Sequence, residues 1–326
     1  MVVLAKGLKF GLAVAALALT GAMGSFAAEE QYPIETVRMI VPYAPGGGGD
    51  ITGRMIAEEI SKRLKTTVVV ENIGGASGTI GTEKAARAKP DGATLLLAGS
   101  AIFTTAPHLT EIGFDPLKDF VAIANVSESV RMLSVPPSLG VKSYEELVAY
   151  GKANPGMLNY ASVGVGSTGH IICVDFLRGA GVEARHIPYS GASQAVQALL
   201  SGDVQFVIDA MVIPPTREGK LVPIAVPSEA RLADFPDVPT FREVGLKDVR
   251  TGGWQAVMAP AGTPPELVQM IEGALKAAAE SPEFQTALTR AGFSPRFRTG
   301  AQLQQELEAE YAYFGELLKT MEVSKK

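Results

Sequence analysis

The hydrophobic positions of this chain fall into short runs that alternate with segments of helical spacing. Residues 37–43 have the β-branched and aromatic content of a buried strand, and Ile51, Met55 and Ile60 then recur at helical spacing. The same order repeats and predicts further strands at residues 67–72, 94–98, 120–126, 131–135, 158–163, 184–189, 204–208, 221–226 and 254–259. Strands that alternate with helices predict an α/β fold with mostly parallel sheets and helices on their faces.

The alternation is interrupted near residue 129 and then restarts, which predicts two units of similar architecture. Pro136-Pro137 ends one strand, and the capping box from Ser143 to Glu146 opens a helix before the next. The strand at 254–259 is expected to return to the first unit. We therefore predict one unit from residues 28–128 plus 251–326 and the other from residues 129–250. Helices are predicted at the end of the chain, over residues 267–279, 283–291 and 303–318.

Two glycine-rich turns connect a strand to a helix in the first unit. Four consecutive glycines at 46–49 precede Asp50, and a similar turn covers residues 73–81. Without a Cβ atom the main chain can approach a ligand closely, and the first N–H groups of the next helix point into the same space. This predicts an anion site, with Asp50 as the helix cap that accepts from N–H groups two or three residues later. A tight connection explains one glycine run equally well, but the second turn favours the anion site.

Comparable turns follow the strands of the second unit, at residues 164–170 and 190–194, and Asp209 ends a further strand. The carboxyl ends of parallel strands meet at one edge of a sheet, where ligands collect. Ser167 and His170 lie at a helix start, where a cap hydroxyl beside a ligand-facing imidazole is favoured over a catalytic pair.

Hydroxyl groups and main-chain N–H groups dominate these turns, and acid-base groups are scarce. Such donors can hold a carboxylate and release it unchanged, as reversible binding requires. The hydroxyl groups concerned belong to Ser77, Ser100, Ser167 and Thr168. Tyr43 and Tyr189 end equivalent strands, where their rings either wall the site or pack in the core.

The first 27 residues have the features of a secretory signal peptide. Lys6 and Lys9 precede the apolar run 10–19, and small residues lead to a predicted cleavage site after Ala27. Removing this segment changes the formal net charge from 29 − 34 = −5 to 27 − 34 = −7. An acidic chain without a basic block argues against nucleic acid or an anionic membrane as partner. We expect an exported, soluble protein.

Several short motifs resemble those of enzymes but lack an essential part. Residues 164–169 satisfy a dinucleotide fingerprint, yet Glu183 precedes the next strand instead of ending it. Residues 48–54 have the spacing of a phosphate loop without its lysine, and no histidine follows Ser193 as the hydrolase order requires. The only cysteine, Cys173, lies in an apolar run that predicts packing, and no cluster has metal-ligand spacing. We predict a protein that is not an enzyme, with no cofactor and no metal.

Six short motifs, in a fixed order, carry a resemblance to a known family. They are Pro42-Tyr-Ala-Pro-Gly-Gly-Gly-Gly-Asp50, Val70-Glu-Asn-Ile-Gly-Gly-Ala-Ser-Gly78, Pro90-Asp-Gly-Ala-Thr94, His186-Ile-Pro-Tyr-Ser-Gly191, Phe235-Pro-Asp-Val-Pro-Thr240 and Ala259-Pro-Ala-Gly-Thr-Pro264. Together they resemble the signatures of the Bug family, the extracytoplasmic solute receptors of tripartite tricarboxylate transporters. The resemblance covers essentially the whole chain after the predicted signal peptide.

The resemblance implies a periplasmic binding protein of the two-lobed, type II-like kind, with the two predicted units as lobes and the ligand in a cleft between them. Closure about a hinge would bury the ligand, and a membrane permease would recognise the closed form. The predicted ligand-binding residues are Tyr43, Ala44, Pro45, Gly46, Gly47, Asp50, Ala76, Ser77, Gly78, Ser100, Ser162, Gly166, Ser167, Thr168, His170, Tyr189, Gly191 and Asp209.

The resemblance further implies a monomer that captures a small carboxylate, such as a di- or tricarboxylate, an acidic amino acid or an aromatic acid. Ser190 stands where a lysine is frequent in the family, and Gly49 stands where a threonine or serine is common. The missing lysine predicts a ligand with less negative charge than citrate. The alternative to transport is a ligand-sensing subunit of a two-component signalling system.

Overall fold

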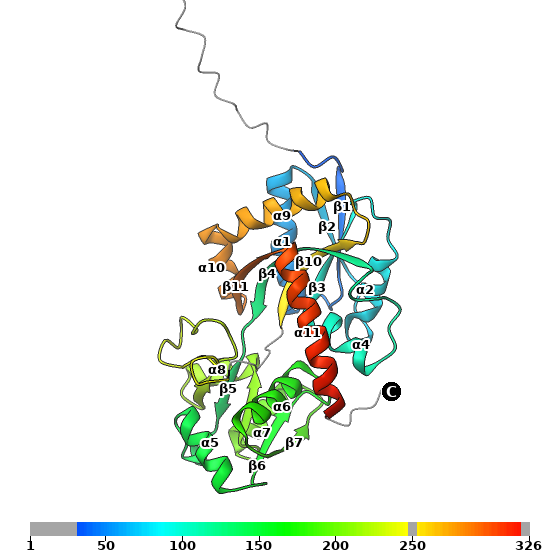
Figure 1. The fold of residues 1–326 in the computed structure, drawn as a ribbon. Coiled ribbons are helices and arrows are strands. Elements are labelled where there is room, and N and C mark those ends of the chain that lie inside the picture. Colours follow the sequence, from blue (N-terminus) through cyan, green and yellow to red (C-terminus); the bar gives the residue numbers. More distant parts are fainter. Residues whose placement is uncertain (1–30, 247–252, 321–326) are drawn as a thin grey trace, which may run out of the picture.

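The computed structural model describes residues 31–246 and 253–320 of the chain. These residues form two lobes, each built on one sheet with helices on both faces, and the lobes lie one above the other in Figure 1. The predicted signal peptide, residues 1–27, lies outside the described residues. None of the helices in the described ranges combines the length and hydrophobicity needed to cross a membrane.

The first lobe contains a six-stranded mixed sheet with the order β11-β4-β10-β3-β1-β2. β1 pairs in parallel with β2 and β3, β10 is antiparallel to β3 and β4, and β11 is antiparallel to β4. The strands are β1 (Thr36–Val41), β2 (Thr67–Asn72), β3 (Thr94–Gly99), β4 (Phe120–Ser129), β10 (Trp254–Pro260) and β11 (Phe293–Thr299). Every residue of β3 is buried, because this strand is central and covered on both faces.

Alternate residues of the first sheet enter two separate hydrophobic clusters. Met39 and Val41 pack beneath one group of helices, whereas Ile40 packs beneath another, because successive side chains of a strand point to opposite faces. One face is covered by α1 (Gly48–Leu64), α9 (Pro265–Ala279) and α10 (Pro282–Arg290). The other is covered by α2 (Thr79–Ala86), α3 (Ser100–Thr104) and α11 (Gly300–Thr320), with the short α4 (Ala106–Leu109) following α3.

The second lobe contains a five-stranded mixed sheet with the order β7-β6-β8-β5-β9. β6 is parallel to β7 and β8, and β5 is antiparallel to β8 and β9. The strands are β5 (Met132–Val135), β6 (Leu158–Ser162), β7 (Ala184–Pro188), β8 (Phe206–Asp209) and β9 (Val222–Ala225). The helices are α5 (Tyr144–Ala153), α6 (Thr168–Ala180), α7 (Ala192–Ser201) and α8 (Ile213–Arg217), with short 3₁₀ turns at Pro137–Leu139 and Ala210–Val212.

The chain passes between the sheets twice, and the two connections lie side by side. Residues 130–131 join β4 to β5, and Gly253 precedes β10 on the return. The N–H of Ser129 donates to the carbonyl of Gly253 at 2.8 Å, so the two connections are held together at this point. The predicted lobe limits, 28–128 plus 251–326 and 129–250, stay a prediction.

The predicted two-lobed fold is confirmed. The prediction of mostly parallel sheets is wrong, because β10 and β11 in the first sheet and β5 in the second run antiparallel to their neighbours. The Ser143 cap of α5 is also confirmed, because its hydroxyl accepts from the N–H of Glu146 at 3.2 Å. The prediction that the chain ends in helices alone is wrong, because β11 lies between α10 and α11. Pro295 disfavours a strand in the sequence; β11 tolerates it as an edge strand with a register irregularity between Pro295 and Arg298.

Side chains also join the lobes away from the connections. Near its C-terminal end α11 packs Phe314 and Leu317 against Ile171 of α6, and the Tyr313 hydroxyl donates to the fully buried Asp175 of α6. In Figure 1 this end of α11 reaches down to the second lobe.

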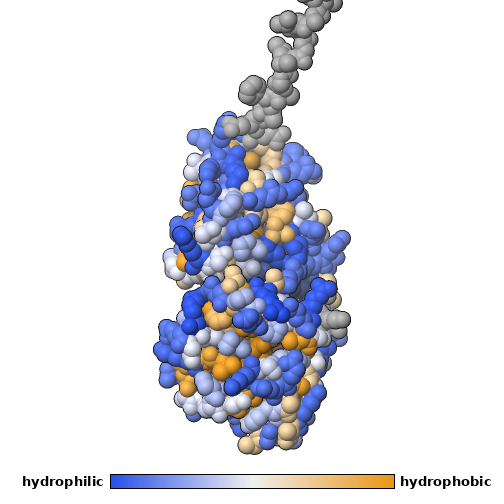
Figure 2. All heavy atoms as spheres, turned by 90° about the vertical axis from the view of Figure 1, so that its left-hand side faces the viewer, coloured by the Kyte–Doolittle hydropathy of each residue, from blue (hydrophilic) through white to orange (hydrophobic). Residues whose placement is uncertain are grey.

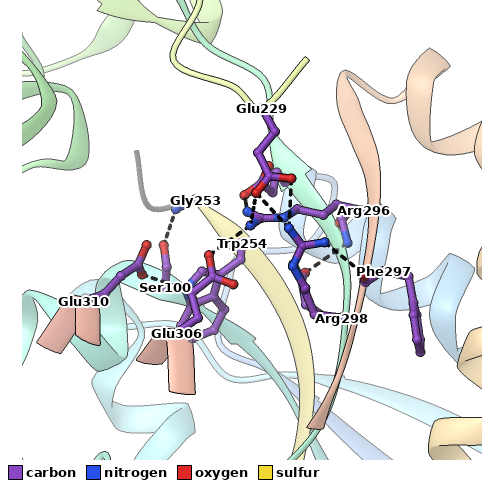
Figure 3. A network of polar contacts seen from close by, with 12 residues as sticks. Ser100, Glu229, Gly253, Trp254, Arg296, Phe297, Arg298, Glu306 and Glu310 are labelled. Atoms are coloured by element: carbon purple, nitrogen blue, oxygen red, sulfur yellow. Dashed lines mark hydrogen bonds and ion pairs between the residues drawn. The ribbon is translucent and has the colours of Figure 1, made fainter. Parts of the chain in front are cut away.

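On the opposite side, Glu229 from the segment after β9 bridges two arginines of β11. It accepts from Arg296 Nη2 at 2.7 Å and from Arg298 Nη2 at 2.8 Å, and Arg296 also pairs with Glu306 at 3.2 Å. Figure 3 shows these carboxylates gathered around the two guanidinium groups. The positive charges of Arg296 and Arg298 are therefore matched by carboxylates of both lobes.

Candidate ligand-binding site

The first glycine turn is held in place by Asp50. Its buried carboxylate accepts from the N–H of Gly46 at 2.9 Å, from Arg54 Nε at 3.1 Å and from Asn72 Nδ2 at 2.9 Å. The Arg54 guanidinium, together with the N–H of Gly46, lowers the pKa of Asp50 to about 2. Ala44, Pro45, Gly46 and Gly47 are exposed above this carboxylate.

The predicted capping role of Asp50 is wrong. α1 begins at Gly48 with Gly47 as its cap residue, and the cap has no side-chain hydrogen bond. Asp50 is therefore already inside the helix, and its carboxylate reaches back to the turn rather than forward along the helix. Because its acceptors are engaged by Gly46, Arg54 and Asn72, its contribution is to shape the turn.

The second turn adopts an unusual backbone conformation directly beside the first. Gly75, Ala76, Ser77 and Gly78 have positive φ values of 116°, 43°, 55° and 95°. A Cβ atom on Gly74 would lie 3.7 Å from the N atom of Ala44, so the two turns are in contact. Main-chain N–H groups of a turn can form a concavity that suits an anion, and strained backbone of this kind clusters at ligand sites. Ala76 and Ser77 are exposed, and Gly78 is buried.

The ring of Tyr43 packs beneath the first turn, against two glycines. A Cβ atom on Gly49 would lie 2.3 Å from Tyr43 Cδ2, and one on Gly99 would lie 1.9 Å from the Tyr43 hydroxyl oxygen. Burial raises the pKa of Tyr43 to about 12. The side chain that a threonine or serine would place at position 49 is thus excluded by the ring in this conformation.

Ser100 starts α3 at the end of β3 and contacts the connection between the lobes. Its buried hydroxyl oxygen accepts from the N–H of Gly253 at 2.5 Å. Ser100, Thr104 and Thr105 line a small cavity together with Thr168 of α6. The structure therefore brings Ser100 and Thr168, two predicted site residues from different lobes, into the lining of one cavity of about 10 Å³.

The start of α6 is organised by local hydrogen bonds. The Ser167 hydroxyl accepts from the N–H of His170 at 3.3 Å, and His170 Nδ1 accepts from the N–H of Gly166 at 3.0 Å. The His170 ring stacks on His186 with ring centroids 3.8 Å apart, and Ser162 bonds His186 Nε2 at 2.7 Å. Burial lowers the pKa of His170 to about 4, so this ring is neutral at physiological pH. Its Nδ1 atom holds the turn and is not available to a ligand.

The remaining predicted residues end β7 and β8. Tyr189 packs against the hydrophobic cluster around α7, and Gly191 is the cap residue of α7. Asp209 accepts from the N–H of Met211 at 2.9 Å. A Cβ atom on Gly169 would lie 3.7 Å from Asp209 Oδ2, so Asp209 lies beside the start of α6. The assignment of the predicted set to ligand binding stays a prediction.

A second groove, of about 250 Å³, lies between the lobes near Phe235 and Phe293. It belongs to the side that faces the viewer in Figure 2, where a waist separates the lobes. None of the predicted site residues lines it, and its arginines are paired: Arg217 with Asp234, and Arg231 with Glu243 at 3.0 Å. An anion there would have to displace a carboxylate, which disfavours this groove as the carboxylate site.

Sequence reasoning did not select Arg131, which lies in the connection between β4 and β5. A single arginine at the start of a strand forms no pattern. The signal that could have found it is its place at the predicted crossing between the two units, where a cleft would open.

The chain is similar to a family of receptors across most of its length. Residues 52–323 match the family described as "Tripartite tricarboxylate transporter family receptor". A Cupriavidus necator protein, "UPF0065 protein in gbd 5'region", is 36% identical over 297 residues, which are 90% of each chain. "Protein BugT" of Bordetella pertussis is 34% identical over 277 residues, which are 84% of this chain and 85% of BugT.

Solved structures of similar proteins have the same fold. A TctC solute binding protein from Polaromonas has a TM-score of 0.80 and 31% identity, covering 89% of this chain and 100% of that one. The R. palustris protein Rpa4515, solved with adipate, has a TM-score of 0.73 and 30% identity over 91% and 100% of the chains. MatC of Rhodopseudomonas palustris, solved with bound malate, has a TM-score of 0.68 and 31% identity over 88% and 100%.

The role of Asp50 predicts a pH-dependent stability difference. Asp50→Asn should lower the free energy of unfolding at pH 7 by about 1.5–3 kcal/mol, the range for hydrogen bonds to a charged group. In the folded protein the pKa of the Asp50 carboxyl lies below its ordinary value of 3.8. The extra stability of the wild type over Asp50→Asn is therefore present above pH 3.8 and is lost as pH falls toward about 2. Urea unfolding at several pH values measures both effects.

Asp237→Asn is the matched control, because Asp237 is exposed and its substitution should leave stability unchanged at each pH. A stability of Asp50→Asn equal to that of the wild type at pH 7 would show that the carboxylate does not hold the turn.

The packing of Tyr43 predicts a rescue experiment. Gly99→Ala should lower the free energy of unfolding by about 1–3 kcal/mol, because the added methyl group overlaps the Tyr43 hydroxyl. The double variant Gly99→Ala/Tyr43→Phe should regain most of that loss, because Phe lacks the oxygen. Gly273→Ala is the control; its Cβ meets nothing within 4 Å, and a helix favours Ala over Gly. Thermal unfolding of the wild type and the three variants measures these differences. A double variant no more stable than Gly99→Ala would contradict the contact between residue 99 and the Tyr43 hydroxyl.

Proposed function

The chain belongs to the tripartite tricarboxylate transporter family of receptors, and on this basis we propose that it captures a small carboxylate between its lobes and delivers it to a membrane permease. The observation that carries the proposal is that predicted site residues of both lobes meet at one point. Ser100 of the first lobe and Thr168 of the second line the same small cavity, of about 10 Å³, which supports a site at the junction of the lobes. Each lobe also ends its parallel strands in turns that present N–H groups and hydroxyls.

The chemistry of these turns suits binding and release of an acid. Main-chain N–H groups at positive-φ turns and at helix starts stabilise a carboxylate through hydrogen bonds and helix dipoles. The histidine at the α6 turn is neutral and engaged, so it is not suited to proton transfer. The related proteins named with adipate and with malate make dicarboxylates the first ligands to test.

The proposal includes the cellular setting. We place the protein in the periplasm as a monomer, after cleavage of residues 1–27, and we propose that the permease recognises the ligand-bound form. Related proteins are described as periplasmic, which supports this location. A monomer fits a receptor whose two lobes come from one chain and surround the ligand.

A ligand panel tests the proposal directly. Isothermal titration of the purified protein with malate, adipate, succinate, glutamate and benzoate should find at least one acid that binds at one site per chain. Adipamide, which has the length of adipate without its charges, should not bind. NMR of the recovered ligand should show it unchanged. Binding of none of the acids, or conversion of one into a product, would contradict the proposed function.

Substitution of Thr168 tests whether its hydroxyl bonds the ligand. Thr168→Val keeps the shape of the side chain and should weaken binding of the acid identified above about fivefold, equivalent to about 1 kcal/mol for one lost hydrogen bond. Thermal stability should be unchanged. Ser167→Ala is less informative, because Ser167 also caps α6. The control is Thr36→Val at the exposed start of β1; equal affinities of all three proteins would exclude Thr168 from the site.

A further inference from the structure

Arg131 lies at the edge of the second sheet that faces the first lobe. It precedes β5, which runs antiparallel to β8 and pairs Met132 with Asp209. The start of β5 therefore lies beside the end of β8, at the same edge as the turns that follow β6 and β7. Arg131 thus shares this edge with the predicted ligand-binding turns of the second lobe.

The Arg131 guanidinium also contacts the return connection. A Cβ atom on Gly253 would lie 2.3 Å from Arg131 Nη1, so Gly253 must lack a side chain for the guanidinium to lie where it does. The N–H of Gly253 is bonded to the Ser100 hydroxyl, and the carbonyl of Gly253 is bonded to Ser129. Arg131 is therefore placed between Ser100 of the first lobe and Asp209 of the second.

The Arg131 guanidinium has no hydrogen bond or ion pair with the residues that the structure describes, 31–246 and 253–320, although the side chain is partly buried. Burial lowers the pKa of Arg131, and the field of the Asp209 carboxylate opposes that effect. Arg296, Arg298, Arg217 and Arg231 are all paired with carboxylates.

A partly dehydrated cation without a partner is costly, and an anion that pairs with it offsets the cost. The planar guanidinium matches both oxygens of a carboxylate, so such a pair is strong and directional. The glycine turns supply N–H donors for one carboxylate, and Arg131 supplies a separate positive site.

We propose that Arg131 binds a second carboxylate of the ligand beside the connections between the lobes, and that it makes the receptor select dicarboxylates over monocarboxylates. The inference rests on the proposed function, because it names the class of acid that the same cleft accepts. Position 190, where a lysine is frequent in the family, is a serine in this chain. Arg131 then supplies a positive charge in place of that lysine. Selectivity in this account arises from one cation and not from the turns.

The test compares adipate with its monoamide, adipamic acid, by titration calorimetry. The wild-type protein should bind adipate at least 10-fold more tightly than adipamic acid. Arg131→Met should weaken adipate binding about 10- to 100-fold and adipamic acid binding much less, so that the preference largely disappears. Arg131→Lys, which keeps the charge but not the planar fork, should be intermediate. Succinate and succinamic acid replace this pair if the panel finds succinate to be the tighter ligand.

Arg185→Met is the matched control, because Arg185 is an exposed arginine on β7 of the same lobe. It should retain the wild-type affinity for both acids. Thermal unfolding of each variant checks that the fold is kept. If Arg131→Met does not fold, the affinities of Arg131→Lys for adipate and adipamic acid provide the test.

A double substitution separates direct pairing from charge balance. If Arg131 only neutralises Asp209, then Arg131→Met/Asp209→Asn should bind adipate as tightly as Asp209→Asn alone. If Arg131 pairs with the ligand, the double variant should remain at least 10-fold weaker than Asp209→Asn.

The outcomes distinguish the inference from the function on which it rests. A wild-type protein that binds a dicarboxylate, with a folded Arg131→Met variant of equal affinity and preference, would overturn the role of Arg131 and leave the receptor function standing. An Arg131→Met/Asp209→Asn variant that binds adipate as tightly as Asp209→Asn would likewise overturn the role of Arg131 and leave the receptor function standing. A wild-type protein that binds no carboxylate would overturn both.

Discussion

The hydrogen bond between the N–H of Ser129 and the carbonyl of Gly253, 2.8 Å long, fixes the two connections between the sheets next to each other. The chain enters the second sheet at β5 and leaves for β10 at this one point, and beside it Ser100, at the end of β3, and Thr168, after β6, line the same cavity. The Ser100 hydroxyl adds a further bond to Gly253. The position of every proposed ligand-binding turn depends on this crossing.

The turns themselves are shaped by contacts within the protein. Asp50 holds the first turn through Gly46 and anchors it to Asn72 at the end of β2. Tyr43 fills the space beneath it, and the left-handed residues 75–78 fix the second turn. Such preorganisation reduces the entropy that binding must overcome. The contacts of Tyr313 with Asp175 and of Glu229 with Arg296 and Arg298 hold the lobes in the arrangement described here, and a hinge motion would have to break them.

Local patterns predicted what depends on local structure. The buried strand Thr94–Gly99 and the Ser143 cap follow from the types of a few neighbouring residues, and so do the glycine turns. Predictions failed where distant segments decide the outcome. β11 pairs only because β4 offers an edge, and the Asp50 carboxylate turns backward because Asn72, at the end of β2, is within reach. Arg131 gains its significance from Gly253 and Asp209, neither of which is near it in the sequence.

The central claim is that an acid binds between the lobes at the turns and at Arg131. A crystal structure of the protein with the tightest-binding dicarboxylate of the panel tests it most directly. The account predicts one carboxylate within hydrogen-bond distance of main-chain N–H groups in the glycine turns or at the start of α6, and the other paired with the Arg131 guanidinium. A ligand found instead in the groove near Phe235 and Phe293, or on the outer surface of one lobe, would contradict it.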